Sequence, residues 1–382
     1  MQIRRCAVLY IEAREEMALD LASLLSGGSA LKATLRWVAL APHLDGETGI
    51  DADQLQALGG IGQTAWVARL DCEQQFGAGP VARLLESGLL IGDAPEYAQQ
   101  RERDETLRAQ HWRPMSAAAH MFSRWDGMRT DSGVQFPTFQ ELVDAYGLPP
   151  PTSVERAPAD AAVALPAPAP APLDDTLFQR YTGRNFDPHA VLPLAVAARL
   201  LQRAFGVQSQ RMMAPDAFVF KKLSPSAGGL HPVEAYVLVQ RVEGVAPGLY
   251  HYHPVRHVLE PVAALDAAAA AALAKQAVAD QEWFVDAPMM VVLAARVVRN
   301  FWKYRNHAKA YRALMLDAGH LSQTFYLLAT EAGLPAFVTA AINEAPLERA
   351  FGLDPLCDAV IAVCGCGAAA AHQTMLELRY EP

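Results

Sequence analysis

The stretch Ser224–Val239, SPSAGGLHPVEAYVLV, joins a turn of small residues to a run of apolar and β-branched residues. Residues 233–242 are typical of a buried strand. Gly228 and Gly229 let the backbone approach a flat or anionic ligand closely, with amides free to donate to it. A plain turn into the strand is the alternative. The turn is neither a Walker loop, because GxxxxGK[ST] is absent, nor a hydrolase elbow, because Ser226 lacks the GxSxG surround.

Helical and extended patterns follow one another irregularly on both sides of this stretch. They predict helices at 193–206, 264–279 and 311–332, and strands at 233–242, 248–252, 257–259, 289–298, 336–340 and 358–364. We expect the first helix to bury Leu194, Ala198, Leu201 and Phe205 on one face. Strict βαβ alternation is missing, so the patterns predict an α+β sandwich, with helices against a mainly antiparallel sheet.

The chain of 382 residues is longer than one usual domain. The proline- and alanine-rich tract at 146–172 cannot hold a helix and indicates a semi-rigid linker. We therefore predict an amino-terminal domain at 1–145 and a carboxy-terminal domain at 173–382. The first domain is expected to be a smaller α/β unit. A helix at 81–88 followed by the short strand Leu89–Ile91 allows a winged-helix-like fold as one interpretation. The charged stretch 102–113 predicts a helix with a solvated face.

Composition excludes several classes of protein. The formal charge of −9 argues against a surface that follows phosphate backbones, so we expect no nucleic-acid partner. The five cysteines contain no CxxC pair, which indicates neither a disulfide framework nor a metal site. The apolar run Cys6–Ile11 is too short for a signal peptide, and no long uncharged apolar segment predicts a membrane span. We expect a cytoplasmic protein.

A short basic turn, Arg180-Tyr181-Thr182-Gly183-Arg184, places two guanidinium groups and a hydroxyl within five residues. Arginine offers planar, bidentate donors that suit a phosphate, and threonine adds a further hydrogen bond. The turn is therefore a candidate phosphate site, with a charged surface turn as the alternative.

A second basic segment, RVVRNFWKYRNHAKAYR at 296–312, carries six basic residues, four aromatic residues and no acid. Loops after buried strands often carry catalytic groups, and a lysine near an electron-accepting ring could stabilise the charge of its reduced form. Lys303 and Tyr304 are therefore candidate catalytic residues. The alternatives are a solvated basic loop and a surface for single-stranded nucleic acid.

Taken in order, these segments resemble the SagB-type dehydrogenases, the azoline-oxidising branch of the nitroreductase-like FMN flavoproteins. They are also similar to the related peptide-maturation dehydrogenases. The resemblance covers about residues 180–367 and rests on RYTGR, SPSAGGLHPVEAYVLV, GLYHYHP, WKYRNHAKAYR, LDAGHLSQTFYLLATEAGL and the closing hydrophobic strand. It implies a nitroreductase-like, FMN-binding fold for the carboxy-terminal domain, and a homodimer with FMN at the subunit interface.

The resemblance also implies roles for individual residues. Cofactor contacts are implied for Arg180, Thr182, Arg184, Pro225, Ser226, Ala227 and Gly228. The first three would hold the phosphate and ribityl chain, and the others would lie against the ring. Lys303 and Tyr304 match catalytic residues of the azoline oxidases. One of them would remove a proton as hydride passes to flavin N5, and oxygen would reoxidise the flavin. We expect the three segments to converge on a single flavin.

Four positions depart from the family's usual residues: Lys222 replaces arginine, Asp317 glutamate, Thr324 asparagine and Cys366 a basic residue. The last change puts one phosphate contact in question. The implied substrate is a ribosomally synthesised precursor peptide, with other peptide-modifying enzymes as further partners. By analogy, the amino-terminal region is similar to leader-peptide recognition modules. The competing functions are an NAD(P)H-dependent nitroreductase or quinone reductase, and a non-catalytic peptide-binding scaffold.

Overall fold

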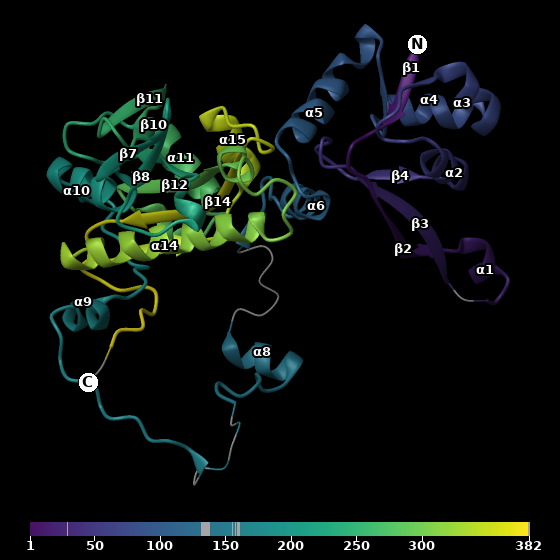
Figure 1. The fold of residues 1–382 in the computed structure, drawn as a ribbon. Coiled ribbons are helices and arrows are strands. Elements are labelled where there is room, and N and C mark those ends of the chain that lie inside the picture. The colour runs from purple at the N-terminus through teal and green to yellow at the C-terminus, as the bar shows by residue number, and fades with distance from the viewer. Residues whose placement is uncertain (29, 131–137, 155, 157, 159–160, 381–382) are drawn as a thin grey trace.

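The computed structural model describes residues 1–28, 30–130, 138–154, 156, 158 and 161–380. Its carboxy-terminal part is built on a six-stranded sheet in the order β11-β10-β9-β12-β14-β13, and all neighbouring strands are antiparallel. Figure 1 labels β10, β11, β12 and β14 of this sheet. The strands are β9 (Val233–Val239), β10 (Gly248–His253), β11 (Val258–Ala264), β12 (Met289–Arg296), β13 (Ala336–Thr339) and β14 (Asp358–Cys366). The predicted α+β class is confirmed.

Helices cover both faces of this sheet. They are α10 (Leu194–Phe205), α11 (Ala267–Ala277), α12 (Glu282–Val285), α13 (Val297–Phe301), α14 (Ala310–Glu331) and α15 (Glu344–Phe351). One hydrophobic cluster joins α10 and α14 to the odd-numbered residues of β9, and a second joins α11 and α15 to the even-numbered ones. Because successive side chains of a strand point to opposite faces, both faces of β9 and β12 lie in a core. This burial explains their almost uninterrupted apolar sequences.

The predicted helix at 311–332 matches α14 to within one residue at each end. Two other helix predictions need correction. The helix predicted at 264–279 begins later, because Val258–Ala264 pairs with β10 and the Asp266 carboxylate caps α11 by accepting the Ala269 N–H at 2.7 Å. The buried face of α10 is made by Ala197, Leu200, Leu201, Ala204 and Phe205. Leu194 lies on the exposed first turn of that helix, not in the core.

The amino-terminal region contains two small sheets, of order β5-β1-β6 and β2-β3-β4. Their strands are β1 (Gln2–Arg5), β2 (Tyr10–Leu19), β3 (Leu31–Leu40), β4 (Thr48–Ile50), β5 (Val67–Ala68) and β6 (Leu90–Gly92). The helices are α1 (Leu21–Leu25), α2 (Ala52–Gly60), α3 (Arg69–Phe76), α4 (Ala78–Glu86), α5 (Ala98–Ala109) and α6 (Pro114–Phe122). α2 and α4 pack with β1, β3 and β6 in a third hydrophobic cluster. The region is thus a smaller α/β unit, as predicted.

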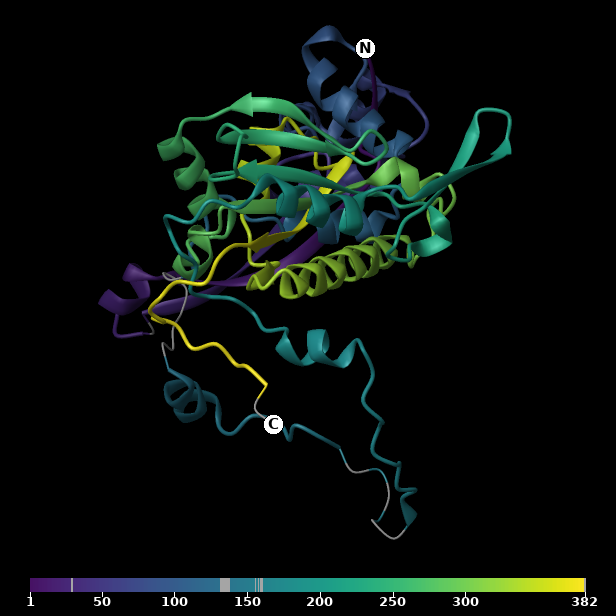
Figure 2. The same cartoon turned by 90° about the vertical axis from the view of Figure 1, so that its left-hand side faces the viewer.

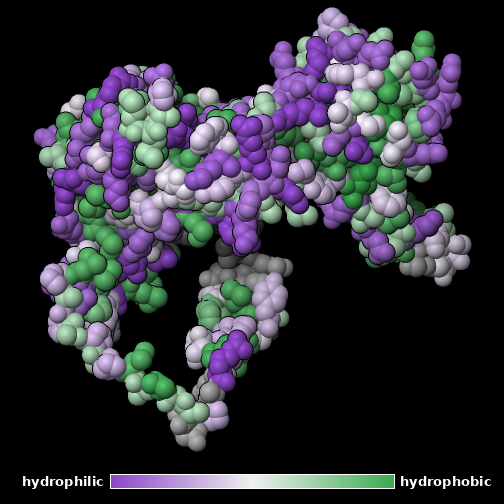
Figure 3. Space-filling model, in the orientation of Figure 1, coloured by the Kyte–Doolittle hydropathy of each residue, from purple (hydrophilic) through white to green (hydrophobic). Residues whose placement is uncertain are grey.

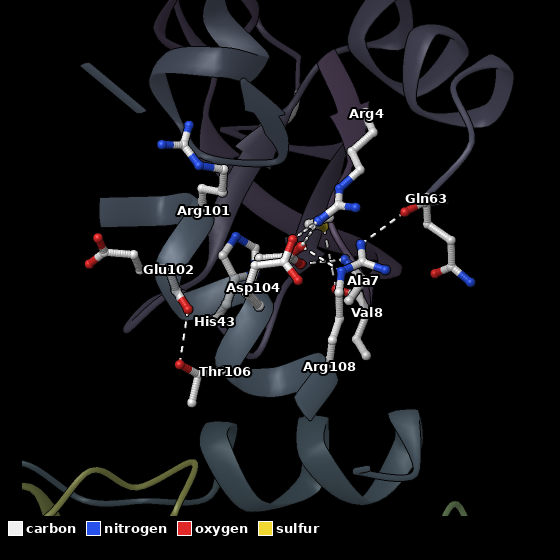
Figure 4. A network of polar contacts seen from close by, with 12 residues as sticks. Arg4, Ala7, Val8, His43, Gln63, Arg101, Glu102, Asp104, Thr106 and Arg108 are labelled. Atoms are coloured by element: carbon white, nitrogen blue, oxygen red, sulfur yellow. Dashed lines mark hydrogen bonds and ion pairs between the residues drawn. The ribbon is translucent and has the colours of Figure 1, made fainter. Parts of the chain in front are cut away.

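The charged helix α5 has the solvated face that its composition suggested, but it also buries an acidic side chain. Asp104 is fully buried and accepts the Ala7 N–H at 2.6 Å and the Arg108 Nε–H at 2.8 Å, and it also pairs with Arg4 at 3.4 Å (Figure 4). A buried carboxylate is tolerated where several donors satisfy it. Asp104 therefore ties α5 to the chain that leaves β1. The helix also ends at Ala109, before the predicted limit at 113.

The segment that follows α5 packs into the carboxy-terminal core. Trp112, Ala117 and Met121 belong to the same hydrophobic cluster as α10 and α14. The Trp112 indole N–H donates to the Leu356 carbonyl at 2.9 Å, and the His120 ring lies 3.0 Å from the Pro355 carbonyl and 3.2 Å from the Tyr311 hydroxyl. The predicted domain limits stay a prediction, but the segment around α6 shares its core with the second region.

His120 predicts an acid-sensitive contribution to stability. Burial, with a smaller effect of Arg124, lowers the pKa of His120 from 6.5 to about 4. The folded chain therefore favours the neutral ring, so this contribution is present above pH 6.5 and is lost as the pH falls through about 4. The pKa shift corresponds to a contribution of about 3 kcal/mol to the free energy of unfolding. Urea unfolding of the wild type and of His120→Gln at pH 7 and pH 4 should show a steeper loss in the wild type, and parallel losses would contradict this.

The stretch from the end of α8 (Phe139–Tyr146) to α9 (Asp174–Gln179) is exposed along the residues that the structure describes, and it loops away from the body of the molecule (Figure 2). In the part of the chain that is described, no helix is long and apolar enough to cross a membrane. On the face drawn in Figure 3, hydrophobic residues gather between α14 and α9. A cleft of about 390 Å³, whose lining includes Phe178, Tyr181 and Arg379, lies beside α9.

Candidate functional site

The loop that contains the sequence PSAGG is anchored to the middle of α14. The Ser226 hydroxyl donates to Asp317 Oδ2 at 2.5 Å, and the Ala227 N–H donates to Asp317 Oδ1 at 3.0 Å. The Ser226 oxygen also accepts the His231 N–H at 2.9 Å. At the start of the loop, the Ser224 and Thr324 hydroxyls lie 2.7 Å apart. These bonds hold the loop from Ser224 to Gly229, which we call the PSAGG loop, against one flank of α14.

Asp317 is the residue that organises this loop, although the sequence showed it only as a departure from the family pattern. Its side chain is buried, and burial raises its pKa, opposed by the hydrogen bonds from Ser226 and Ala227. Both carboxylate oxygens are engaged by one loop. A shorter side chain than the family's glutamate thus still reaches the loop.

Gly228 brings the PSAGG loop against the predicted catalytic pair. Its backbone is left-handed, with φ of 61°. A Cβ atom at this position would lie 2.6 Å from the Tyr304 hydroxyl oxygen and 2.9 Å from Lys303 Nζ. Glycine suits the left-handed backbone, and any Cβ here would require the ends of both side chains to shift. The structure therefore brings Gly228, Lys303 and Tyr304 to one place, as the sequence predicted.

Lys303 and Tyr304 are the second and third residues of the loop at 302–309, which connects α13 to α14. The backbone N–H groups of both residues donate to the Asn300 carbonyl, at 3.3 Å and 3.2 Å. The buried Asn300 side chain crosses the loop and donates to the Ala310 carbonyl at 2.9 Å. Lys303 is exposed, Tyr304 is half-buried, and Lys303 Nζ lies 5.7 Å from the centre of the Tyr304 ring. A substrate can therefore reach both groups.

The basic turn at 180–184 lies near the carboxyl end of α14. The Thr182 and Tyr326 hydroxyls are 3.1 Å apart, and the Arg180 guanidinium lies 5.6 Å from the centre of the Tyr326 ring. Thr182 bridges to Ala336 of β13, and the Arg184 N–H donates to Glu377. Within the described residues, neither the Arg180 nor the Arg184 guanidinium forms an ion pair with a carboxylate. In this described part of the chain, both positive charges are therefore available to an anion.

The three predicted segments do not all meet within one chain. Asp317, which holds the PSAGG loop, and Tyr326, which holds the basic turn, are separated on α14 by about 13 Å along the axis and by about half a turn around it. The PSAGG loop and the Lys303–Tyr304 pair lie together on one flank. Arg180 and Thr182 lie on the other flank, with the exposed face of α14 between them, where Leu316 is 59% exposed.

Two further positions differ from what the sequence suggested. Lys222 is buried beneath the PSAGG loop in a small cavity shared with Ser226, His231 and Asp317, and burial lowers its pKa to about 8. In the sequence, Lys222 stood out only because it precedes the loop in place of the family's arginine. Cys366 lies fully inside the core on β14. Its thiol therefore does not replace the family's basic phosphate contact.

Known proteins share this architecture and these segments. The model of the nitroreductase family matches residues 177–368. A protein of Methanocaldococcus jannaschii named "Putative nitroreductase MJ1384" is 33% identical over 172 residues, which are 45% of this chain and 80% of that protein. The microcin B17-processing protein McbC of Escherichia coli is 26% identical over 177 residues, which are 45% of this chain and 61% of McbC.

A solved structure extends the likeness in fold beyond the matched segment. A chain of the Escherichia coli microcin synthetase McbBCD complex, solved with truncated pro-MccB17 bound, superposes with a TM-score of 0.51 at 21% identity. The superposition covers 70% of this chain and 94% of that one. The family match spans half of the present chain and includes the basic turn, the PSAGG loop, the Lys303–Tyr304 pair and α14. The chain belongs to the nitroreductase family.

Proposed function

We propose that this chain is an FMN-dependent dehydrogenase that oxidises a ribosomally synthesised peptide during its maturation. The observation that carries the proposal is the approach of Gly228 to Lys303 Nζ and the Tyr304 hydroxyl. A glycine backbone and two proton-transferring side chains at one exposed place provide a surface for a flat ring and groups that can act on a substrate beside it.

The residues present fit FMN, the cofactor that the resemblance of the motifs implies. Arg180 and Arg184 offer guanidinium groups without carboxylate partners in the described chain, which suits a phosphate. The PSAGG loop has no large side chain on its tip, so a ring could lie directly on its backbone. We assign the phosphate and ribityl chain to Arg180, Thr182 and Arg184, and the ring to residues 225–228.

In the proposed reaction, bound FMN supplies the two-electron acceptor for the peptide's hydride. Tyr304 and Lys303 remove and carry the accompanying proton at the Tyr304 oxygen and Lys303 Nζ. Asp317 keeps the PSAGG loop in place through Ser226 and Ala227. The azoline-to-azole oxidation of the resembling enzymes is the two-electron change that we propose, with oxygen as the final acceptor.

A homodimer would complete this site. The basic turn and the PSAGG loop lie on opposite flanks of α14, so one chain does not offer both to a single ligand. A second copy packed on the exposed face of α14, where Leu316 lies uncovered, could bring its own segment to the opposite flank. We therefore propose that each FMN is held between two subunits.

A precursor peptide is the proposed substrate, and McbC, a microcin B17-processing protein, supports this choice. The match spans 61% of McbC, so peptide chemistry is carried over here only as a proposal. In the amino-terminal region, α2, α3 and α4 accompany the three-stranded antiparallel sheet β5-β1-β6. We propose that this winged-helix-like unit recognises the leader of the peptide, and that other peptide-modifying enzymes act with it.

An absorption spectrum of the purified chain tests the proposal first. We expect a yellow protein that releases FMN on denaturation and loses its colour under anaerobic conditions when the precursor peptide is added. Mass spectrometry should then show that the peptide has lost two hydrogens. A colourless protein that FMN cannot reconstitute would sink the proposal. Rapid bleaching by NAD(P)H alone, without peptide oxidation, would favour a nitroreductase or quinone reductase, and peptide binding without any oxidation would favour a scaffold.

Removal of one basic side chain should weaken cofactor binding. Charge-assisted hydrogen bonds contribute about 1.5 to 3 kcal/mol each, so Arg180→Ala or Arg184→Ala should raise the Kd for FMN by about 10- to 150-fold. Arg203→Ala is the matched control, because Arg203 is an exposed arginine on α10 outside the proposed site. Fluorescence titration of the apoprotein with FMN measures the effect. Equal affinities of all three variants for FMN would show that the basic turn does not bind the FMN phosphate.

A further inference from the structure

The loop at 302–309, which begins with Trp302, Lys303 and Tyr304, rests on a segment of the amino-terminal region. The Asn306 N–H donates to the His111 carbonyl at 3.2 Å. The next residue, Trp112, meets the Phe301 ring edge-on at 5.0 Å and the Tyr311 ring at 5.7 Å. Phe301 is the last residue of α13, and Tyr311 lies in the first turn of α14. His111 and Trp112 therefore contact the middle of the loop and the two helices that flank it.

Trp112 is itself held firmly. Its side chain is 4% exposed, its indole N–H donates to the Leu356 carbonyl, and it stacks on His120 at 5.3 Å. The His120 ring in turn contacts the Tyr311 hydroxyl and the Pro355 carbonyl. A fixed tryptophan beneath a loop restricts how far the loop can move, because close-packed rings leave no free volume.

Apart from the contact with His111 and Trp112, the loop is held by hydrogen bonds within its own turns and by the packing of Tyr304 against the core. All of its residues except Tyr304 are exposed. Asn300 connects its two ends, and within the described residues the hydrogen bond from Asn306 to His111 joins the backbone at the tip of the loop to the amino-terminal region. Asn306 adopts a left-handed conformation with φ of 51°, and His111 does so with φ of 57°. Two strained turns thus face each other across the contact, as is common where a loop must hold a defined geometry.

We propose that His111 and Trp112 form a positioning element for Lys303 and Tyr304, so that the amino-terminal region takes part in catalysis through the loop at 302–309. This inference rests on the proposed function and adds a regulatory route to it. In this proposal, the region that binds the peptide includes the same segment that fixes the positions of the two catalytic side chains. Movement at His111 and Trp112 changes where Lys303 and Tyr304 stand relative to Gly228.

The first test changes the loop without touching the core. Asn306→Val places a β-branched residue at a left-handed position and disfavours the turn that directs the N–H to His111, whereas Asn306→Gly keeps that conformation available. We expect hydrogen–deuterium exchange in residues 302–309 to rise in Asn306→Val and to remain near the wild type in Asn306→Gly. Exchange in residues 224–231 should be unchanged in both. Unchanged exchange of the loop in Asn306→Val would overturn the proposal.

The second test asks whether this mobility of the loop changes kcat, measured with the full-length chain. A catalytic group displaced by about 1 Å can cost about 100-fold in rate. We expect kcat for peptide oxidation to fall by about that factor in Asn306→Val and Trp112→Ala, with KM and FMN content unchanged. Asn306→Gly and Trp112→Phe should recover most of it. Trp66→Phe is the control, since Trp66 lies under Arg4 in the same region, away from the loop.

The two proposals fail in different ways. A wild-type chain that binds no FMN or leaves the peptide unoxidised would overturn the proposed function, while exchange of the loop would still decide whether His111 and Trp112 hold it. An active Asn306→Val with full kcat and a loosened loop would overturn the positioning role alone. If Trp112→Ala raises exchange uniformly over the carboxy-terminal sheet, the effect of that variant is structural, and the result for Asn306→Val decides the positioning role.

Discussion

Lys303→Ala should lower kcat for peptide oxidation by about 100- to 10,000-fold, because general acid–base groups contribute rate factors of that size. Lys303 is exposed and its Nζ lies where the PSAGG loop comes nearest, so its removal leaves the core intact. Tyr304→Phe, which loses only the hydroxyl, should show which of the two groups takes the proton. The variant with the larger loss in kcat and an altered pH profile carries that role.

The control for this prediction is Lys309→Ala. Lys309 is an exposed lysine of the same loop at the N-cap of α14, and it is not among the nearest contacts of a Cβ at Gly228. It should keep the activity of the wild type, and all variants should bind FMN with unchanged stoichiometry. Stopped-flow measurement of flavin bleaching by the peptide under anaerobic conditions isolates the step in question. Full bleaching rates in both Lys303→Ala and Tyr304→Phe would show that neither side chain acts in the reaction.

Gly228→Ala should cause the second large loss of activity, and Gly229→Ala is the matched comparison. Gly228 and Gly229 both have left-handed backbones, at φ of 61° and 68°. A Cβ at Gly228 would press on Lys303 and Tyr304, whereas a Cβ at Gly229 meets no atom within 4 Å. Both changes should cost about 1 to 2 kcal/mol of backbone strain. Only Gly228→Ala should also displace the catalytic pair and lower kcat by about 100-fold.

Thermal unfolding separates the strain from the displacement. Similar melting temperatures for the two variants, together with activity lost in Gly228→Ala alone, would support the assignment of the site. If Gly229→Ala loses as much activity as Gly228→Ala, activity depends on the backbone conformation of the loop. The contact of the loop with Lys303 would then have no role in the loss. Because both variants keep Ser226 and Ala227, the anchor on Asp317 stays the same in the comparison.

The features that could be predicted from the sequence are those that depend on local pattern. The period of apolar residues located α14 to within one residue, and the apolar run that begins at Met289 identified a strand buried on both faces. That strand ends at Arg296, before the predicted limit at 298, because the next residues begin α13. The helix at 264–279 was placed too early because alanine favours a helix in any context. Only the pairing of Val258–Ala264 with β10 extends the strand and delays the helix to Asp266.

The features that could not be predicted depend on contacts between distant residues. Asp104 belongs to a highly charged stretch, and only the fold shows that the Ala7 N–H and Arg108 satisfy it in the interior. Trp112 reaches the core of the second region across more than 180 residues of chain, to Phe301 and Leu356. The order of the motifs indicated their common family, but not that α14 stands between the basic turn and the PSAGG loop.

Asp317 and Tyr326 lie on one helix, so the helix fixes the distance and the angle between the two segments that they hold. Each residue of an α-helix adds about 1.5 Å and about 100° of rotation. Insertion or deletion of one residue between these positions would swing one anchor sideways relative to the other. Substitutions along the exposed face leave the spacing intact. Lineages descended from such a chain should thus tolerate many exchanges in this helix while conserving its length, a constraint that alignments of relatives can reveal.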